Sequence, residues 1–193
     1  EAYQDTFTDA EQQEYDEEEA SIGGGTDFSQ FPEILLALIG APYEFGPPLV
    51  DAITSHGGDE AVDQAFSEPP VSSEQVLDPS LYLEGEQPLD VAEPPADGES
   101  FDQGTFGQYL LLLLLTDGGV DQQEAARAAV GWGGDQYVAW RDGDETCLRV
   151  SFEGDTGDDT TEIADALDEW ASGRDGAEVT TNADDQPTLT SCG

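Results

Sequence analysis

The chain has 193 residues, of which 45 are Asp or Glu and only 4 are Lys or Arg, so its formal net charge is −41. All four basic residues are scattered arginines, so the chain lacks the basic footprint that nucleic acids and anionic membranes require. Hydrophobic residues make up 37% of the chain, which is enough material for a folded core rather than a disordered polymer. A folded chain with such an acidic excess and no lysine is typical of an extreme halophile, and we predict an archaeal one.

The first half of the chain is predicted to be helical and rich in loops. Residues 3–20 carry one thin apolar stripe among acidic and amide side chains, which favours a solvated helix, and the glycines of 21–27 end it. Three short helices are expected to follow, separated by pairs of prolines and glycines, at 32–39, 49–56 and 59–66.

The next segment is predicted to hold a turn of helix and then an extended connector. Ser72 and Gln75 have the spacing of a capping box, which places the helical turn at 74–77. The residues 82–98 are rich in proline and are expected to be extended.

The second half has clearer periodicity, with helices and strands in the order α-α-β-β-α-β-β. This order predicts an α+β fold in which a small antiparallel sheet, a hairpin plus two C-terminal strands, packs against helices. We expect a helical, loop-rich region over 1–100, which continues an upstream segment, and an α+β domain over 101–193. The alternative is that the two regions form one compact unit. The elements expected in this half are helices at 106–116, 121–130 and 158–172 and strands at 136–141, 147–152, 177–181 and 187–192.

The two cysteines are Cys147, in a strand-like run, and Cys192, next to the last residue. Two buried free thiols are the alternative, but a terminal Ser-Cys-Gly is seldom buried, so we predict a disulfide between them. A disulfide favours an extracellular or cell-surface location. The acidic first residues contain no apolar signal segment, so the chain is expected to be a mature portion or a C-terminal fragment.

Catalytic and metal-binding motifs are scarce in this sequence. His56 is the only histidine, so the common zinc sites cannot be built from this chain, and a position at a helix end favours a capping role. We predict no cofactor and no catalytic residue. Two acidic loops, Asp155, Asp158 and Asp159, and Asp142, Asp144 and Glu145, are interpreted as solvated, with Na⁺, K⁺ or Ca²⁺ held weakly if at all.

The segment 131–137, Gly-Trp-Gly-Gly-Asp-Gln-Tyr, is the most distinctive short motif. Glycines beside a tryptophan allow a sharp turn while the indole packs inward, so we interpret the motif as a helix-to-strand corner. A carbohydrate platform is the alternative, because it would use the same aromatic side chains. The residues that either interpretation involves are Trp132, Gly133, Asp135, Tyr137 and Trp140.

Two segments, 66–88 and 131–140, together resemble the paired signatures of a secreted bacterial and archaeal family that is similar to HExxH zinc metallopeptidases of the gluzincin kind. The first contains two prolines, a Ser-Glu-Gln step, a Tyr-Leu and a Gly-Glu, and the resemblance extends over roughly residues 30–193. It implies a haloarchaeal cell-surface branch of that family. The zinc-binding helices of the family lie upstream of the matching region and are absent from this chain, and Asp78 stands where many members have histidine.

The function expected from the sequence is therefore non-catalytic: a structural or interaction role of a halophilic protein at the cell surface, metallopeptidase-like in ancestry. Its partner would be the N-terminal portion of the same precursor or another envelope protein, without insertion into the membrane. One alternative is the C-terminal half of a cleaved zinc metallopeptidase whose ligands lie on another chain. A second is a carbohydrate-binding or filament-associated surface module.

Overall fold

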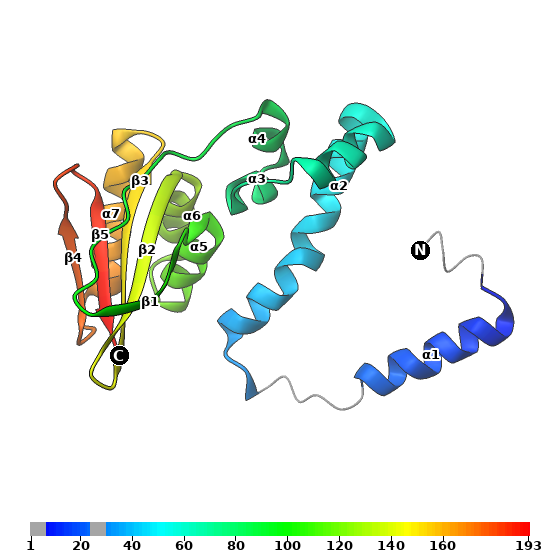
Figure 1. Ribbon diagram of the computed structural model, residues 1–193, viewed down its shortest axis with the longest axis horizontal. Helices are drawn as coiled ribbons and strands as arrows, with labels where there is room; N and C mark the ends of the chain where they lie inside the picture. Colours follow the sequence, from blue (N-terminus) through cyan, green and yellow to red (C-terminus); the bar gives the residue numbers. More distant parts are fainter. Residues whose placement is uncertain (1–6, 24–29) are drawn as a thin grey trace. The chain divides into compact units, whose positions relative to one another are not determined.

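The computed structural model describes residues 7–23 and 30–193, which form two compact units divided after Gly40. Helix α1 (Asp9–Gly23) belongs to the first unit, and α2 (Glu33–Ser67) begins there and continues into the second (Figure 1). The helix predicted over 3–20 corresponds to α1 from residue 9. The first part of that prediction and most of the break predicted at 21–27 lie outside the described residues. The change of region predicted near residue 100 falls within the second unit.

Helix α2 corrects the prediction of three short helices to two: the helices predicted at 32–39 and 49–56 are continuous, whereas Gly58 separates the one predicted at 59–66. Helix α2 passes through Pro42, Pro47 and Pro48 and is kinked at Gly58, whose φ of 67° and ψ of −157° are not helical. Proline removes one backbone hydrogen bond but keeps a helical φ, so these prolines interrupt the hydrogen-bond ladder without ending the helix. Glycine reaches a positive φ without strain, and the predicted break at Gly58 is therefore confirmed as a kink.

Two short helices follow α2. Ser72 caps α3 (Ser73–Leu77) as predicted, because its hydroxyl accepts a hydrogen bond from the Gln75 amide at 3.2 Å. Asp78 caps α4 (Pro79–Glu84) in the same way, accepting from the Ser80 amide at 3.0 Å. Since α4 and its C-cap Gly85 occupy the start of the predicted connector, the extended conformation begins after Gly85.

The sheet confirms the predicted fold class, an α+β fold with a small antiparallel sheet. Its strand order is β1-β2-β3-β5-β4, and every neighbouring pair is antiparallel. The β2–β3 hairpin and the two C-terminal strands were predicted, whereas β1 was not. The strands are β1 (Glu99–Gly104), β2 (Trp132–Asp142), β3 (Glu145–Gly154), β4 (Ala177–Thr181) and β5 (Pro187–Cys192).

Three helices cover one face of this sheet: α5 (Gly107–Asp117), α6 (Gln122–Val130) and α7 (Gly157–Ala171), as Figure 1 shows. The main core lies between them and the sheet, because the apolar side of α7 and the inward residues of β3 meet there. Its fully buried side chains include Leu111, Leu115, Trp132, Phe152, Ile163 and Leu167.

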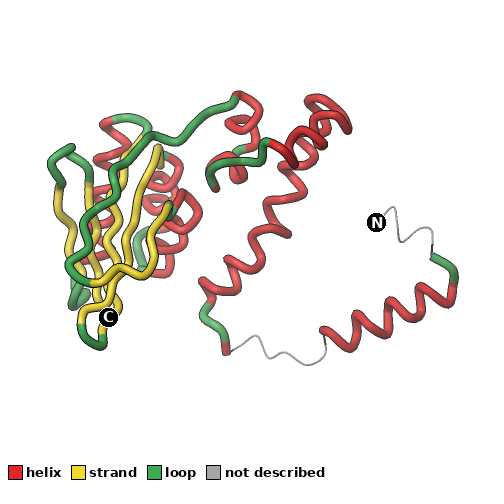
Figure 2. Tube along the Cα trace, viewed as in Figure 1, coloured by secondary structure: helices red, strands yellow, loops and turns green. Residues whose placement is uncertain are grey.

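An extended segment over 86–98, which we call the strap, crosses the opposite face of the sheet (Figure 2). The Leu89 amide donates to the Gly133 carbonyl at 2.8 Å, and Val91 is only 4% exposed. Ala96 packs against a second, smaller core of Val138, Trp140 and Cys147. Both faces of the sheet are thus covered, one by helices and the other by the strap.

Candidate functional site

Asp135, near the start of β2, joins the predicted corner to the first turn of α5. Its side chain is 3% exposed, and its Oδ1 accepts a hydrogen bond from the Phe106 amide at 2.5 Å. Its Oδ2 accepts from the Gly107 amide at 2.6 Å and from the Trp132 indole at 2.7 Å. Helix α5 has no side-chain cap at Phe106, so Asp135 supplies that cap from another element. Burial raises the pKa of Asp135, and the three hydrogen bonds oppose that rise.

The two glycines after Trp132 allow the strap to pass close to the corner. A Cβ atom on Gly134 would lie 2.4 Å from the Leu89 carbonyl oxygen, and one on Gly133 would lie 2.9 Å from the Asp155 amide. Trp132 itself is fully buried in the main core. Only glycine leaves room for this contact between strap and strand, which supports the interpretation of the motif as a structural corner.

The other aromatic residues singled out in the sequence also make contacts within the fold. Trp140 is 2% exposed, lies against Ala96 of the strap, and has the Arg149 guanidinium 5.0 Å from its ring centroid. Tyr137 is half-buried, and its hydroxyl donates to Asp102 at 2.9 Å. A sugar could stack on neither indole unless the fold opened.

Carboxyl groups gather beside this corner, and we call Glu74, Glu86 and Asp155 the acidic corner. Burial, together with the charges of Asp155, Glu86 and Asp78, raises the pKa of Glu74 to about 7. The pKa of Glu86 is raised by burial and then by Asp155. The pKa of Asp155, at the exposed rim, is raised by desolvation and then by Asp159. Perturbed carboxyl groups so close together mark this as the candidate functional site.

Two members of the acidic corner, Glu74 and Glu86, also have buried oxygen atoms without a hydrogen-bond partner. Within the described part of the chain, the buried side-chain atoms that lack a partner are Glu74 Oε2, Glu86 Oε2 and Gln108 Oε1. The Ser73 hydroxyl accepts from the Tyr109 amide at 3.2 Å, which brings α3 against the first turn of α5, where Gln108 lies. Sequence reasoning missed this site, because nothing in the local sequence separates Glu74 from the other acidic residues.

The acidic loops proposed as weak cation sites are surface features. Asp159 forms the capping box of α7 with Thr156, and Asp142, Asp144 and Glu145 lie at the exposed β2–β3 turn. Over residues 7–23 and 30–193, no three His, Cys, Asp or Glu side chains are arranged to hold a metal ion. Weak binding of Na⁺, K⁺ or Ca²⁺ stays a prediction.

His56 lies within α2, just before the kink, and its side chain is exposed. It lines a groove of about 640 Å³ together with residues of α2, α3 and α4. The lining contains a single carboxylate, Glu68, and its amides include Gln64 and Gln75. Because Gln75 is hydrogen-bonded at both ends, to the Val71 amide and the Glu86 carbonyl, its amide serves the fold.

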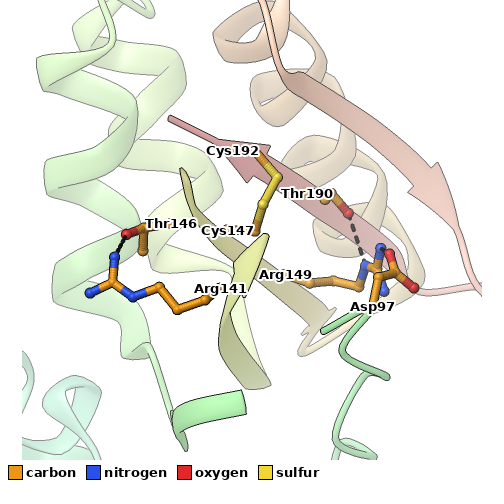
Figure 3. Close-up of a disulfide and its surroundings, with 7 residues drawn as sticks. All are labelled: Asp97, Arg141, Thr146, Cys147, Arg149, Thr190 and Cys192. Carbon is orange, nitrogen blue, oxygen red and sulfur yellow. Dashed lines mark hydrogen bonds and ion pairs between the residues drawn. A yellow bond between two sulfur atoms is a disulfide. The ribbon is translucent and has the colours of Figure 1, made fainter. Parts of the chain in front are cut away.

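The predicted disulfide is present between Cys147 on β3 and Cys192 on β5 (Figure 3). The two residues face each other directly in the antiparallel register, with Cα atoms 4.1 Å apart. Thr146 and Gly193 exchange backbone hydrogen bonds of 3.1 and 3.2 Å beside it, which extends the pairing to the last residue. Arg149 lies farther along β3, paired with Asp97 of the strap at 2.6 Å.

One family profile matches the chain, that of a family described as Domain of unknown function (DUF8575), over residues 94–191. The match covers just over half of the chain and includes the end of the strap, the whole sheet up to Ser191, and Asp135. No curated protein and no solved structure matches this chain.

Proposed function

We propose that this chain, which belongs to the family described as Domain of unknown function (DUF8575), is a non-catalytic interaction protein of a halophile's cell surface that binds another envelope protein. The observation that carries the proposal is an exposed apolar stripe along α2. The metallopeptidase-like ancestry and the cleaved-peptidase alternative stay predictions.

The α2 stripe consists of apolar residues whose helical spacing places them on one side of the helix. Its members, all in the first unit, and their exposed fractions are Leu35 (39%), Leu38 (37%) and Ile39 (56%). Between Glu33 and Asp51 the helix carries a single charged residue, Glu44. A run of exposed apolar side chains on such an acidic chain favours contact with another protein. Within the described ranges, no helix is long and apolar enough to cross a bilayer.

The residues that the sequence motif at 131–140 singled out are used to hold the fold together. The two carboxylate oxygens of Asp135 accept three hydrogen bonds, and Trp132 and Trp140 are buried. The disulfide is compatible with an oxidising compartment outside the cell. These features support a structural role for the α+β domain, with binding assigned to the helix that precedes it.

A photo-reactive amino acid at Ile39 tests the binding proposal in intact cells of the native host. We expect it to form one discrete adduct with an envelope protein, because Ile39 lies within the α2 stripe. The same probe at Ser55, an exposed position on α2 outside the stripe, serves as the control and should give none. Equal labelling at both positions, or recovery of the chain from the cytosol with free thiols, would contradict the proposal.

The proposed habitat predicts that the fold depends on salt. Screening shortens the range of carboxylate repulsion from about 10 Å at about 0.1 M salt to about 3 Å at 1 M and less beyond. The melting temperature, followed by circular dichroism, should therefore rise steeply as KCl increases to the molar range. Equal melting temperatures in dilute and molar KCl would contradict the proposal that the acidic surface is an adaptation to concentrated salt.

A further inference from the structure

We propose that the acidic corner is a proton-binding site, which holds α3 and the start of the strap against the sheet domain when Glu74 carries a proton and loosens them when it does not. The inference is independent of the α2 stripe. It adds a regulated contact within the second unit to the binding function proposed above.

The geometry calls for a proton because two carboxyl groups of the acidic corner, Glu74 and Glu86, each carry a buried oxygen that has no hydrogen-bond donor. Glu74 is 4% exposed, and Glu86 contributes its oxygen from the strap. An ionised carboxylate only accepts hydrogen bonds, whereas a protonated one also donates. A proton on Glu74 therefore supplies a donor and removes a buried charge in one step.

Every charged group that faces Glu74 is acidic. Asp78 faces it from the end of α3, Glu86 from the strap, and Asp155 from the loop after β3. Asp159, on α7, acts on Asp155. The chain's basic groups are engaged elsewhere: Arg127 with Glu162, Arg141 with Thr146 and Phe101, Arg149 with Asp97, and Arg174 with Trp170.

Helix α3 and the strap are coupled mechanically as well as by charge. The Gln75 side-chain amide donates to the Glu86 carbonyl at 2.5 Å, so α3 and the start of the strap are joined. On the domain side, the Ser73 hydroxyl bonds the Tyr109 amide, and the Leu89 amide bonds the Gly133 carbonyl. These few bonds and a five-residue helix leave the region less stable than the sheet core, so it can open alone.

The direction of the pH effect follows from the raised pKa of Glu74, about 7 against an ordinary 4.5. Between these two values the docked state binds more protons than the open one, so docking weakens as the pH rises and levels off above pH 7. Glu86 and Asp155, whose pKa values are raised too, act in the same direction.

Hydrogen exchange of the full chain at constant molar salt, followed by mass spectrometry, tests the proposal. In the wild type, protection of α3 and of Leu89 should fall by up to about tenfold per pH unit between about pH 5 and about pH 7, after correction for intrinsic exchange. Amides of β3 should not change. Glu74→Gln should lose most of this pH dependence, keeping only the part due to Glu86 and Asp155, and Glu84→Gln, which neutralises an exposed carboxyl on α4, should behave like the wild type.

A second variant keeps the test decisive if Glu74→Gln does not fold. Glu86→Gln removes one facing charge and should reduce the loss of protection without abolishing it. A flat profile in the wild type, an unchanged pH dependence in Glu74→Gln, or the full wild-type loss of protection in Glu86→Gln would each overturn the proposal.

Discussion

Replacing Asp135 by alanine is expected to lower the free energy of unfolding by about 4 kcal/mol, a large share of the stability of a small domain. The alanine would leave the Phe106 and Gly107 amides and the Trp132 indole without an acceptor, all in a buried place. It would also leave the first turn of α5 with the Ser73 hydroxyl, which accepts from the Tyr109 amide, but without the cap on Phe106 and Gly107. Asparagine should not rescue the variant, because whichever way its amide is turned, the NH₂ group faces one of these donors.

Asp121→Ala provides the matched control for that measurement. Asp121 also caps a helix, α6, accepting from the Gln123 amide at 3.0 Å and the Glu124 amide at 3.4 Å, but it is exposed. Water can replace its hydrogen bonds, so the expected loss is about 1 kcal/mol. Urea denaturation at constant salt measures both variants without changing the ionic strength. Similar losses in the two variants would show that burial of Asp135 contributes little.

The elements that could be predicted are those in which the spacing of apolar residues shows which side packs on the core. Strands β4 and β5 were predicted to the residue, and α7 was predicted to within a residue at each end. Their apolar residues recur at the strand or helix period because one side packs on the core. Strand β1 was missed for the converse reason. It is an edge strand exposed along nearly its whole length, so its sequence carries no alternation.

The acidic corner could not be predicted, because its properties arise from contacts between distant segments. Glu74 becomes buried only when α3 meets α5, and its pKa rises because the strap and the loop after β3 bring Glu86 and Asp155 toward it. The corner motif did point to Trp132 and Gly133. It did not reveal that Asp135 caps α5, because Asp135 and Gly107 are far apart in the sequence.

Reducing the disulfide is the second change expected to have a large effect, about 4 kcal/mol of unfolding free energy by the loop-entropy estimate for its separation of 45 residues. The bridge closes a loop that contains α7, β4 and β5, so its loss enlarges the unfolded ensemble more than that of a short-range bridge. Local opening should concentrate at the end of β5, where the Cys192 amide bonds the Gly176 carbonyl.

Two comparisons separate the bridge from the packing of its sulfur atoms. Wild-type chain that is unfolded and refolded with reductant keeps the side-chain volume and loses only the cross-link, so it should lose about 4 kcal/mol. The pair Cys147→Ala and Cys192→Ala should lose more, because Cys147 is fully buried in the core under the strap and alanine leaves a cavity there. Reductant should not affect that double variant. If oxidised and reduced wild type unfold at the same urea concentration, the pairing of β3 with β5 and its packing on α7 hold the C-terminus without the bridge.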